Sequence, residues 1–288
     1  MVFDTVEKQD IRTLDIDKVV KGFALVDYIF KSLVSVSTTN GDSIRWYQET
    51  AADLTVTAPS TIPSATLATF PFLEHSWQRN TSFPKKYAVE GFISIEDLKT
   101  TDIDVQARTV LRLTRAVVKQ VDTRIYNILT ESQSPTNIGT GASAGTGWDD
   151  TTNGNPVLDI MSGQQIIAES NYNPMGGVIA MNPKNHKDLM NYLITVKGSS
   201  IPAFSVEKIR SGVVMNLLGM RVVVSNNVVA DSVALGVFDQ ACTWKTLMGT
   251  TAKMIEDPGL GVKIRVWEEG EAILTDPKAM FLITNTDT

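Results

Sequence analysis

The sequence predicts an α+β fold, in which one long helix precedes a small α/β unit and a group of terminal strands. Three observations indicate it. Apolar residues recur at helical spacing over residues 102–129, Asn-Pro pairs open two shorter helices beyond residue 151, and the C-terminal segment alternates apolar strands with turns. The 288 residues are 43% hydrophobic and 20% charged, which is typical of an ordered globular protein that buries a core.

Charge and cysteine content exclude several classes of protein. The net charge of −6 argues against recognition of nucleic acid by sequence. The N-terminal residues lack a basic patch followed by an apolar run, and no apolar run approaches the roughly 20 residues of a membrane span, so we expect neither a signal peptide nor a transmembrane helix. The single cysteine, Cys242, excludes an internal disulfide framework and fits assembly in a reducing cytoplasm.

The chain begins with an arm, residues 1–42, followed by an extended loop, residues 43–92. The arm mixes charges of both signs, with a predicted helix at Lys18–Leu33 and a predicted turn at Asn40-Gly41. In the loop, a Thr- and Ala-rich stretch contains three prolines that oppose a regular central strand: Pro59, Pro63 and Pro71. Alternation over residues 87–94 predicts a strand at its end. About 50 residues of such chain bury little surface of their own, so they form either a flexible surface loop or a segment that a partner covers.

The stretch DIDVQARTVLRLTRAVVKQVDTRIYNIL, residues 102–129, predicts a helix of roughly 40 Å at about 1.5 Å per residue. Thr101 and Asp104 have the spacing of a capping box at its start. The apolar stripe comprises Ile103, Ala107, Val110, Val117, Val121, Ile125 and Ile128. The basic stripe, nearly opposite, comprises Arg108, Arg112, Arg115 and Lys119. The basic stripe is either a solvated face or a surface that faces a polyanion.

The remaining chain predicts a linker and then alternating elements. The glycines between Gly139 and Gly147 lack the Gly-Lys-Ser/Thr ending of a phosphate-binding loop, so residues 130–150 are interpreted as a linker. Asn155-Pro156 and Asn182-Pro183 each supply a cap and a first-turn proline for a helix. Strands are expected in GGVIAM, MRVVVSNNV and VALGVFD, and then in a last segment with turns at Pro258-Gly259, Gly270 and Asp276-Pro277.

No catalytic, cofactor or metal site is predicted. His75 and His186 have no paired spacing for zinc, and Ser162 lies outside a Gly-x-Ser-x-Gly motif. The neighbouring carboxylates Glu268–Glu269 and Asp149–Asp150 are interpreted as solvated charges. A soluble hydrolase that uses Ser162 or Cys242 with His186 is a distant alternative.

Three passages together resemble the major capsid protein of tailed double-stranded DNA phages and related viruses, the HK-97 type. YAVEGFISIEDLKTTDIDVQARTVLRLTRAVVKQVDTRIYNIL is similar to the family's passage from the extended loop into its spine helix. NPVLDIMSGQQIIAESNYNPMGGVIAMNPKNHKDLMNYL is similar to the start of its axial domain, and LLGMRVVVSNNV with KIRVWEEGEAILTDPKAMFLIT is similar to its later strands. The resemblance covers about residues 42–288. It implies an N-terminal arm at 1–42, an extended loop at 43–92, a peripheral domain at 93–150 and 243–288, and an axial domain at 151–242.

The resemblance also implies a function in assembly, with no enzymatic activity and no cofactor. Hexamers and pentamers of the chain would close, in the host cytoplasm, into an icosahedral shell around double-stranded DNA, with a portal, a separate scaffolding protein and possible decoration proteins as partners. The loop would lie over a neighbouring subunit, with Trp46, Pro59, Pro63, Pro71, Lys85 and Lys86 as candidate contact residues. The basic stripe would face packaged DNA without reading its sequence. The alternative within the fold is an encapsulin nanocompartment that encloses cargo enzymes.

Overall fold

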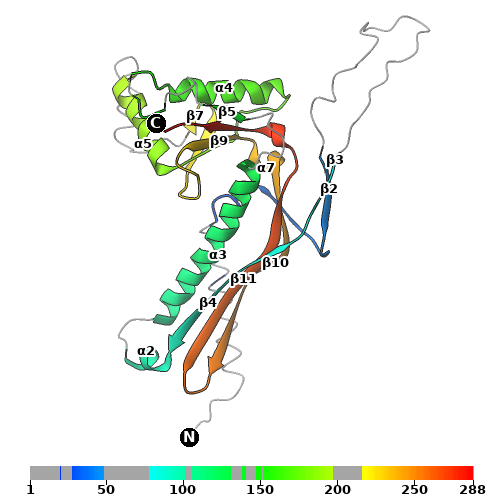
Figure 1. The fold of residues 1–288 in the computed structure, drawn as a ribbon, viewed down its shortest axis with the longest axis vertical. Coiled ribbons are helices and arrows are strands. Elements are labelled where there is room, and N and C mark those ends of the chain that lie inside the picture. Colours follow the sequence, from blue (N-terminus) through cyan, green and yellow to red (C-terminus); the bar gives the residue numbers. More distant parts are fainter. Residues whose placement is uncertain are drawn as a thin grey trace, which may run out of the picture.

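The computed structural model describes residues 20, 28–48, 78–100, 105–130, 138–140, 147–150, 152–196 and 216–287. They form two parts (Figure 1): an elongated part, in which a long helix lies along a four-stranded sheet, and a wider head around a six-stranded sheet. A two-stranded ribbon projects from the side of the elongated part. The predicted α+β fold is confirmed.

The four-stranded sheet has the order β1-β10-β11-β4. Its strands are β1 (Ser35–Thr38), β10 (Cys242–Asp257), β11 (Gly261–Leu274) and β4 (Lys85–Ser94). β1 runs parallel to β10, and the other pairs are antiparallel. The alternation at residues 87–94 therefore marked a real strand. The Ser- and Thr-rich β1, which lacks such alternation, was missed, as was the short helix α2 (Ile95–Thr100).

The long helix is α3 (Val105–Thr130), whose 26 residues span about 39 Å. The predicted apolar stripe is largely confirmed, because Val110, Val117, Val121 and Ile125 are buried against the sheet. Ala107 was assigned wrongly and is exposed. Ile103 and the proposed capping box lie outside the described residues.

The head sheet has the order β5-β12-β9-β6-β8-β7. Its strands are β5 (Ile138–Thr140), β12 (Met280–Thr284), β9 (Ser232–Gly236), β6 (Val178–Met181), β8 (Met220–Val224) and β7 (Asn216–Leu217). β5 lies within the segment interpreted as a linker. β12 was expected with the peripheral strands 243–288, but it pairs with β9 in the head. Four of its five residues are buried and it packs under a head helix, which covers its apolar surface better than an edge of the elongated sheet would.

Both predicted Asn-Pro helix starts are confirmed. α4 (Pro156–Glu169) begins after Asn155, whose side chain accepts a hydrogen bond from the Leu158 amide. α5 (Pro183–Asn191) begins after Asn182, whose side chain accepts from the Lys184 amide, and it continues into a π-helical turn, Tyr192–Val196. A side-chain acceptor before a first-turn proline is a local device, so sequence alone identified it.

Two other predictions were wrong. β11 runs straight through Gly270, where a turn was expected. A Cβ there would lie 2.7 Å from the Trp244 ring, so the glycine permits close packing of that ring inside the sheet. The arm helix predicted at Lys18–Leu33 does not extend through its last residues, because residues 28–34 form turns and bends.

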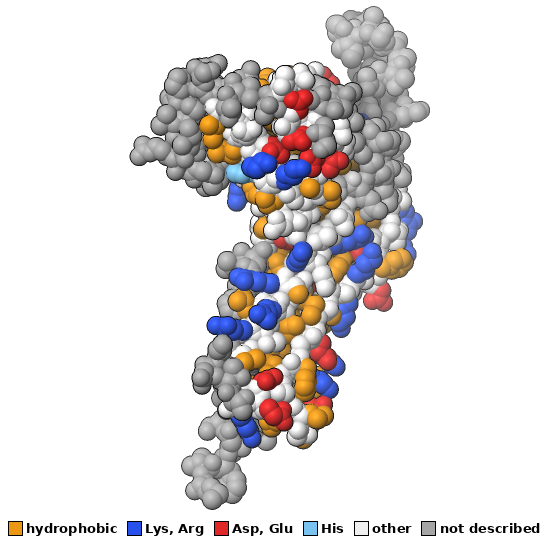
Figure 2. Space-filling view, turned by 60° about the vertical axis from the view of Figure 1, so that its left-hand side comes forward, with side chains coloured by type: hydrophobic (Ala, Val, Ile, Leu, Met, Phe, Trp, Pro, Cys, Tyr) orange, Lys and Arg blue, Asp and Glu red, His pale blue; other side chains and the backbone are white. Residues whose placement is uncertain are grey.

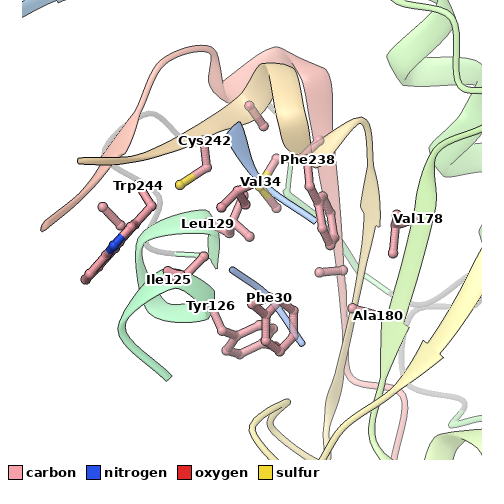
Figure 3. Packing of buried hydrophobic residues seen from close by; sticks show 14 of the residues in the cluster. Phe30, Val34, Ile125, Tyr126, Leu129, Val178, Ala180, Phe238, Cys242 and Trp244 are labelled. Carbon is pink, nitrogen blue, oxygen red and sulfur yellow. The ribbon is translucent and has the colours of Figure 1, made fainter. Parts of the chain in front are cut away.

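The arm, α3 and the head share one hydrophobic core (Figure 3). Phe30 and Val34 of the arm pack with residues of α3, with Trp244 of β10, with Phe238 of the short helix α7 (Phe238–Ala241), and with β6. The rings of Phe30 and Tyr126 lie 5.4 Å apart between centroids. Residues 28–34 are therefore part of the folded body.

We expect Phe30→Ala to lower the free energy of unfolding by about 3–5 kcal/mol, because it leaves a cavity in this shared core. Urea unfolding followed by tryptophan fluorescence measures the change. Phe83→Ala is the matched control, because Phe83 is 63% exposed and its loss should change stability by less than about 0.5 kcal/mol. Equal effects of the two substitutions would contradict the packing of Phe30.

Candidate nucleic-acid interface and assembly surfaces

The predicted basic stripe lies on the exposed side of α3. Arg108, Arg112, Arg115 and Lys119 are all exposed, whereas the apolar residues between them face the sheet. Their steps of four, three and four residues place them along one face for about 17 Å. The stripe thus offers a row of cations to any polyanion that runs along the helix.

Charge is distributed unevenly between the two parts. Among the described residues, Lys and Arg outnumber Asp and Glu in the elongated part, and the reverse holds in the head. Figure 2 shows the same trend on one face: basic side chains recur along the elongated part, and acidic ones gather on the head and near the narrow end. The acidic overall charge therefore does not prevent local attraction of a polyanion to the elongated part.

The projecting ribbon consists of β2 (Ile44–Gln48) and β3 (Gln78–Ser82), paired antiparallel. A two-stranded ribbon is marginally stable by itself. Tyr47 is 60% exposed and Phe83, just after β3, is 63% exposed. The ribbon thus presents aromatic surface that its own chain leaves uncovered.

The candidate loop residues fall into three groups. Trp46 is the middle residue of β2 and pairs with Asn80, and its indole Nε1 donates a hydrogen bond of 2.9 Å to the Leu274 carbonyl of the same chain. Lys85 and Lys86 open β4 and form ion pairs within the chain, with Glu271 at 3.6 Å and Glu269 at 3.2 Å. Pro59, Pro63 and Pro71 lie outside the described residues.

The three residues of the hydrolase alternative lie on separate elements: Ser162 on α4, His186 on α5 and Cys242 on β10. Cys242 is completely buried in the shared core, where burial and then the Glu271 carboxylate raise the pKa of its thiol to about 12. Ser162 lies on the exposed side of α4 and donates to the Leu158 carbonyl oxygen. Burial lowers the pKa of His186, which is half-buried on α5. A substrate cannot reach Cys242 without opening the core.

Within the part of the chain that the structure describes, no group of three or more His, Cys, Asp or Glu side chains is placed to hold a metal ion. None of the helices within those ranges is long and apolar enough to cross a membrane.

We expect Cys242 to resist alkylation by iodoacetamide at pH 8 in the folded protein and to react fully in urea. With a pKa near 12, only about one thiol in 10,000 is ionised at pH 8, and burial blocks the reagent as well. Thr81→Cys, on the exposed side of β3, is the control for a reactive thiol. Rapid labelling of folded wild-type protein would contradict the assignment.

The raised pKa of Cys242 makes the stability of the folded protein decrease at high pH. The thiol of the unfolded chain ionises from about pH 8.5, whereas the folded thiol stays protonated until about pH 12. Its contribution to stability is therefore complete below pH 8.5 and falls between these values by up to about 1.4 kcal/mol per pH unit.

Sequence reasoning missed a cluster of buried carboxylates where the arm, α3 and β11 meet. Glu268 was interpreted as a solvated charge, but Glu268 and Glu271 are 0% exposed and Asp122 is 1% exposed. No periodicity distinguishes a buried glutamate from an exposed one. Only the spatial approach of Lys31 and Arg124 reveals the partners.

An elongated helix-and-sheet part, an α/β head and a projecting ribbon together define an HK-97-like shell protein, whose role is structural. A family model described as phage capsid protein matches residues 80–283, and the chain belongs to this family. It is thus a structural protein of the virion capsid, a shell built from many copies of one chain. The predicted resemblance and structural role are confirmed.

Solved structures agree with this fold. The capsid of cyanophage P-SCSP1u matches with a TM-score of 0.68 at 14% identity, over 91% of this chain and 89% of that chain. Mycobacterium phage Che8 matches with a TM-score of 0.65 at 18% identity, over 91% and 92%. The virus-like particle from Pyrococcus furiosus matches with a TM-score of 0.64 at 12% identity, over 94% and 99%. No curated protein sequence matches the chain.

Proposed function

We propose that this chain is a major capsid protein whose hexamers and pentamers close, in the host cytoplasm, into an icosahedral shell around double-stranded DNA. The observation that carries the proposal is the projecting ribbon, because Tyr47 of β2 and Phe83, just after β3, are largely exposed. A neighbouring copy covers that surface in a closed shell. The elongated part then serves as the peripheral domain, and the head, with β5 and β12, as the axial domain.

The DNA contact in this proposal rests on the basic stripe of α3. Four exposed cations in a row neutralise phosphate without touching base edges, so the contact is independent of sequence. The acidic head does not share in this contact. A portal, a scaffolding protein and decoration proteins are further partners that we propose for the assembled shell.

Expression of the chain with its phage packaging proteins tests the function. We expect closed icosahedral particles in negative-stain micrographs, with DNA that resists added nuclease until the particles are opened. A soluble protein of 31.5 kDa that never assembles would overturn the proposal. Esterase or peptidase turnover by that monomer would restore the hydrolase alternative.

A second candidate is a nanocompartment that encloses enzymes. The virus-like particle from Pyrococcus furiosus favours it, because the match spans 99% of that chain. Small uniform shells that contain protein cargo and no nucleic acid would support this candidate over the phage capsid.

A further inference from the structure

The buried carboxylate cluster lies at the base of the projecting ribbon. The chain enters the ribbon from the arm through β1 and leaves it through β4, which begins three residues after β3 ends. We call residues 28–38 the incoming root and residues 83–86 the outgoing root. Both roots contact β11, the strand that carries Glu268 and Glu271.

Glu268 holds the incoming root. The Lys31 ammonium lies 2.5 Å from Glu268 Oε1, and the Tyr28 hydroxyl donates to Oε2, which also accepts from Thr250 at 3.0 Å. On the other side of the same segment, Asp122 of α3 accepts from the backbone amides of Ile29 at 2.8 Å and Lys31 at 3.1 Å. The incoming root is therefore fixed between β11 and α3.

Glu271 holds the outgoing root and α3. Arg124 Nε of α3 donates to its Oε1 at 2.6 Å, and the Lys85 ammonium lies 3.6 Å from its Oε2. Oε2 has no hydrogen-bond partner among the described residues, so the contact with Lys85 is the looser of the two. Lys85 and Lys86 also pair along the backbone with Gly270 and Glu269 of β11, so Glu271 adds a side-chain contact to a root that the sheet already holds.

The burial of these carboxylates has a consequence for the geometry of the junction. Apolar residues of similar volume would stabilise the junction as well or better, because desolvation offsets most of the attraction within a buried ion pair. A hydrogen bond to a carboxylate forms only within a narrow range of distances and angles, whereas apolar side chains can contact one another in many arrangements. Completely buried glutamates at this position therefore favour one direction of the ribbon more than they favour stability.

We propose that Glu268 and Glu271 form a polar joint that fixes the direction in which the ribbon leaves the elongated part. In the shell, which rests on the function proposed above, this direction sets the angle between neighbouring subunits and hence the curvature. Glu268 and Glu271 are positioning residues, because they act through the two roots and not by contact with the neighbour.

The test is Glu268→Gln together with Glu271→Gln. Glutamine keeps the shape and removes the charge, and of the cations concerned Lys85 is 56% exposed whereas Lys31 and Arg124 are only 16% and 26% exposed. Glu269→Gln is the matched control, because Glu269 is on the same strand and pairs with Lys86, but its side chain is 23% exposed. Thermal unfolding should show little change in Glu269→Gln and a lower midpoint in the double variant, because the loss of one partner from a buried ion pair is destabilising.

Spin labels measure the direction of the ribbon directly. Labels go on Thr81→Cys of β3 and Gln120→Cys of α3, both exposed, while the buried Cys242 stays unlabelled. We expect a narrow distribution of distances between the two labels in the otherwise unchanged protein and in Glu269→Gln. In the double variant, we expect this distribution to be at least twofold broader. Electron micrographs should show particles of one diameter for the first two and several diameters or open sheets for the double variant.

A narrow distribution and uniform shells in the folded double variant would overturn the joint. If the double variant fails to fold, Lys85→Gln decides, because its side chain is more than half exposed and the change removes only the side-chain contact of the outgoing root with Glu271. An unchanged distribution in Lys85→Gln overturns the proposal equally. A parent chain that makes no shells overturns the proposed function alone, since the label distances in the soluble protein still test the joint.

Discussion

Deletion of residues 55–70 is expected to abolish closed shells and leave soluble capsomers or monomers. These residues lie between β2 and β3 in the sequence, so the deletion shortens the segment that connects the two strands. They include the apolar residues Val56, Ile62, Leu67 and Phe70, and a neighbouring subunit is a surface on which such side chains gain burial. A loss of several hundred Å² of buried area at every interface in a symmetric shell prevents closure.

Sedimentation velocity and negative-stain microscopy measure this outcome. A full-length variant in which residues 55–70 are replaced by an equally long Gly/Ser segment is the control for loop length. We expect it to fail as well, because it keeps the connection and loses the side chains. Normal shells from either variant would refute the role of the loop in contacts between subunits.

Replacement of Arg108, Arg112, Arg115 and Lys119 by Gln is expected to leave shells intact and reduce the DNA they retain. The side chains are exposed, so the fold tolerates glutamine at all four positions. Removal of each cation that neutralises a phosphate should lower the salt dependence of DNA binding by about 0.9 in the log–log slope. The reduction should be largest for the longest genomes, in which DNA is packed most densely.

The control carries the same change of charge on the opposite side of the sheet. Four cations alternate along the strands with the residues that pack against α3: Lys86, Lys253, Lys263 and Arg265. Their replacement by Gln therefore leaves the basic stripe unchanged. DNA content is measured by nuclease-resistant DNA per particle after heating. Equal losses in both quadruple variants would show that overall charge matters and the stripe does not.

Local patterns predicted the parts of this molecule that local physics determines. Helical periodicity identified α3, the two Asn-Pro pairs identified α4 and α5, and alternation identified β4. In each case the evidence lies within a few turns or one strand of the chain. The basic stripe was visible for the same reason, although its partner stays a prediction.

Contacts between distant segments account for what sequence reasoning missed. β1 forms because β10 offers it an edge, and β5 forms on β12, more than 140 residues away in the chain. Glu268 appeared to be an ordinary charge beside Glu269 until folding brought Lys31 and Tyr28 to it. Gly270 was assigned to a turn because its neighbours in the sequence do not show why a glycine is required there. The reason is the indole of Trp244 on another strand, which leaves no room for a Cβ at position 270.

The position of β12 has a consequence for the order of events in the cell. It lies between β5 and β9, yet it follows every other strand that the structure describes. During synthesis, β9 can pair with β6, but its other edge has no partner until residues 280–284 have left the ribosome. Nascent chains in which residues 280–284 are not yet available therefore lack a finished head.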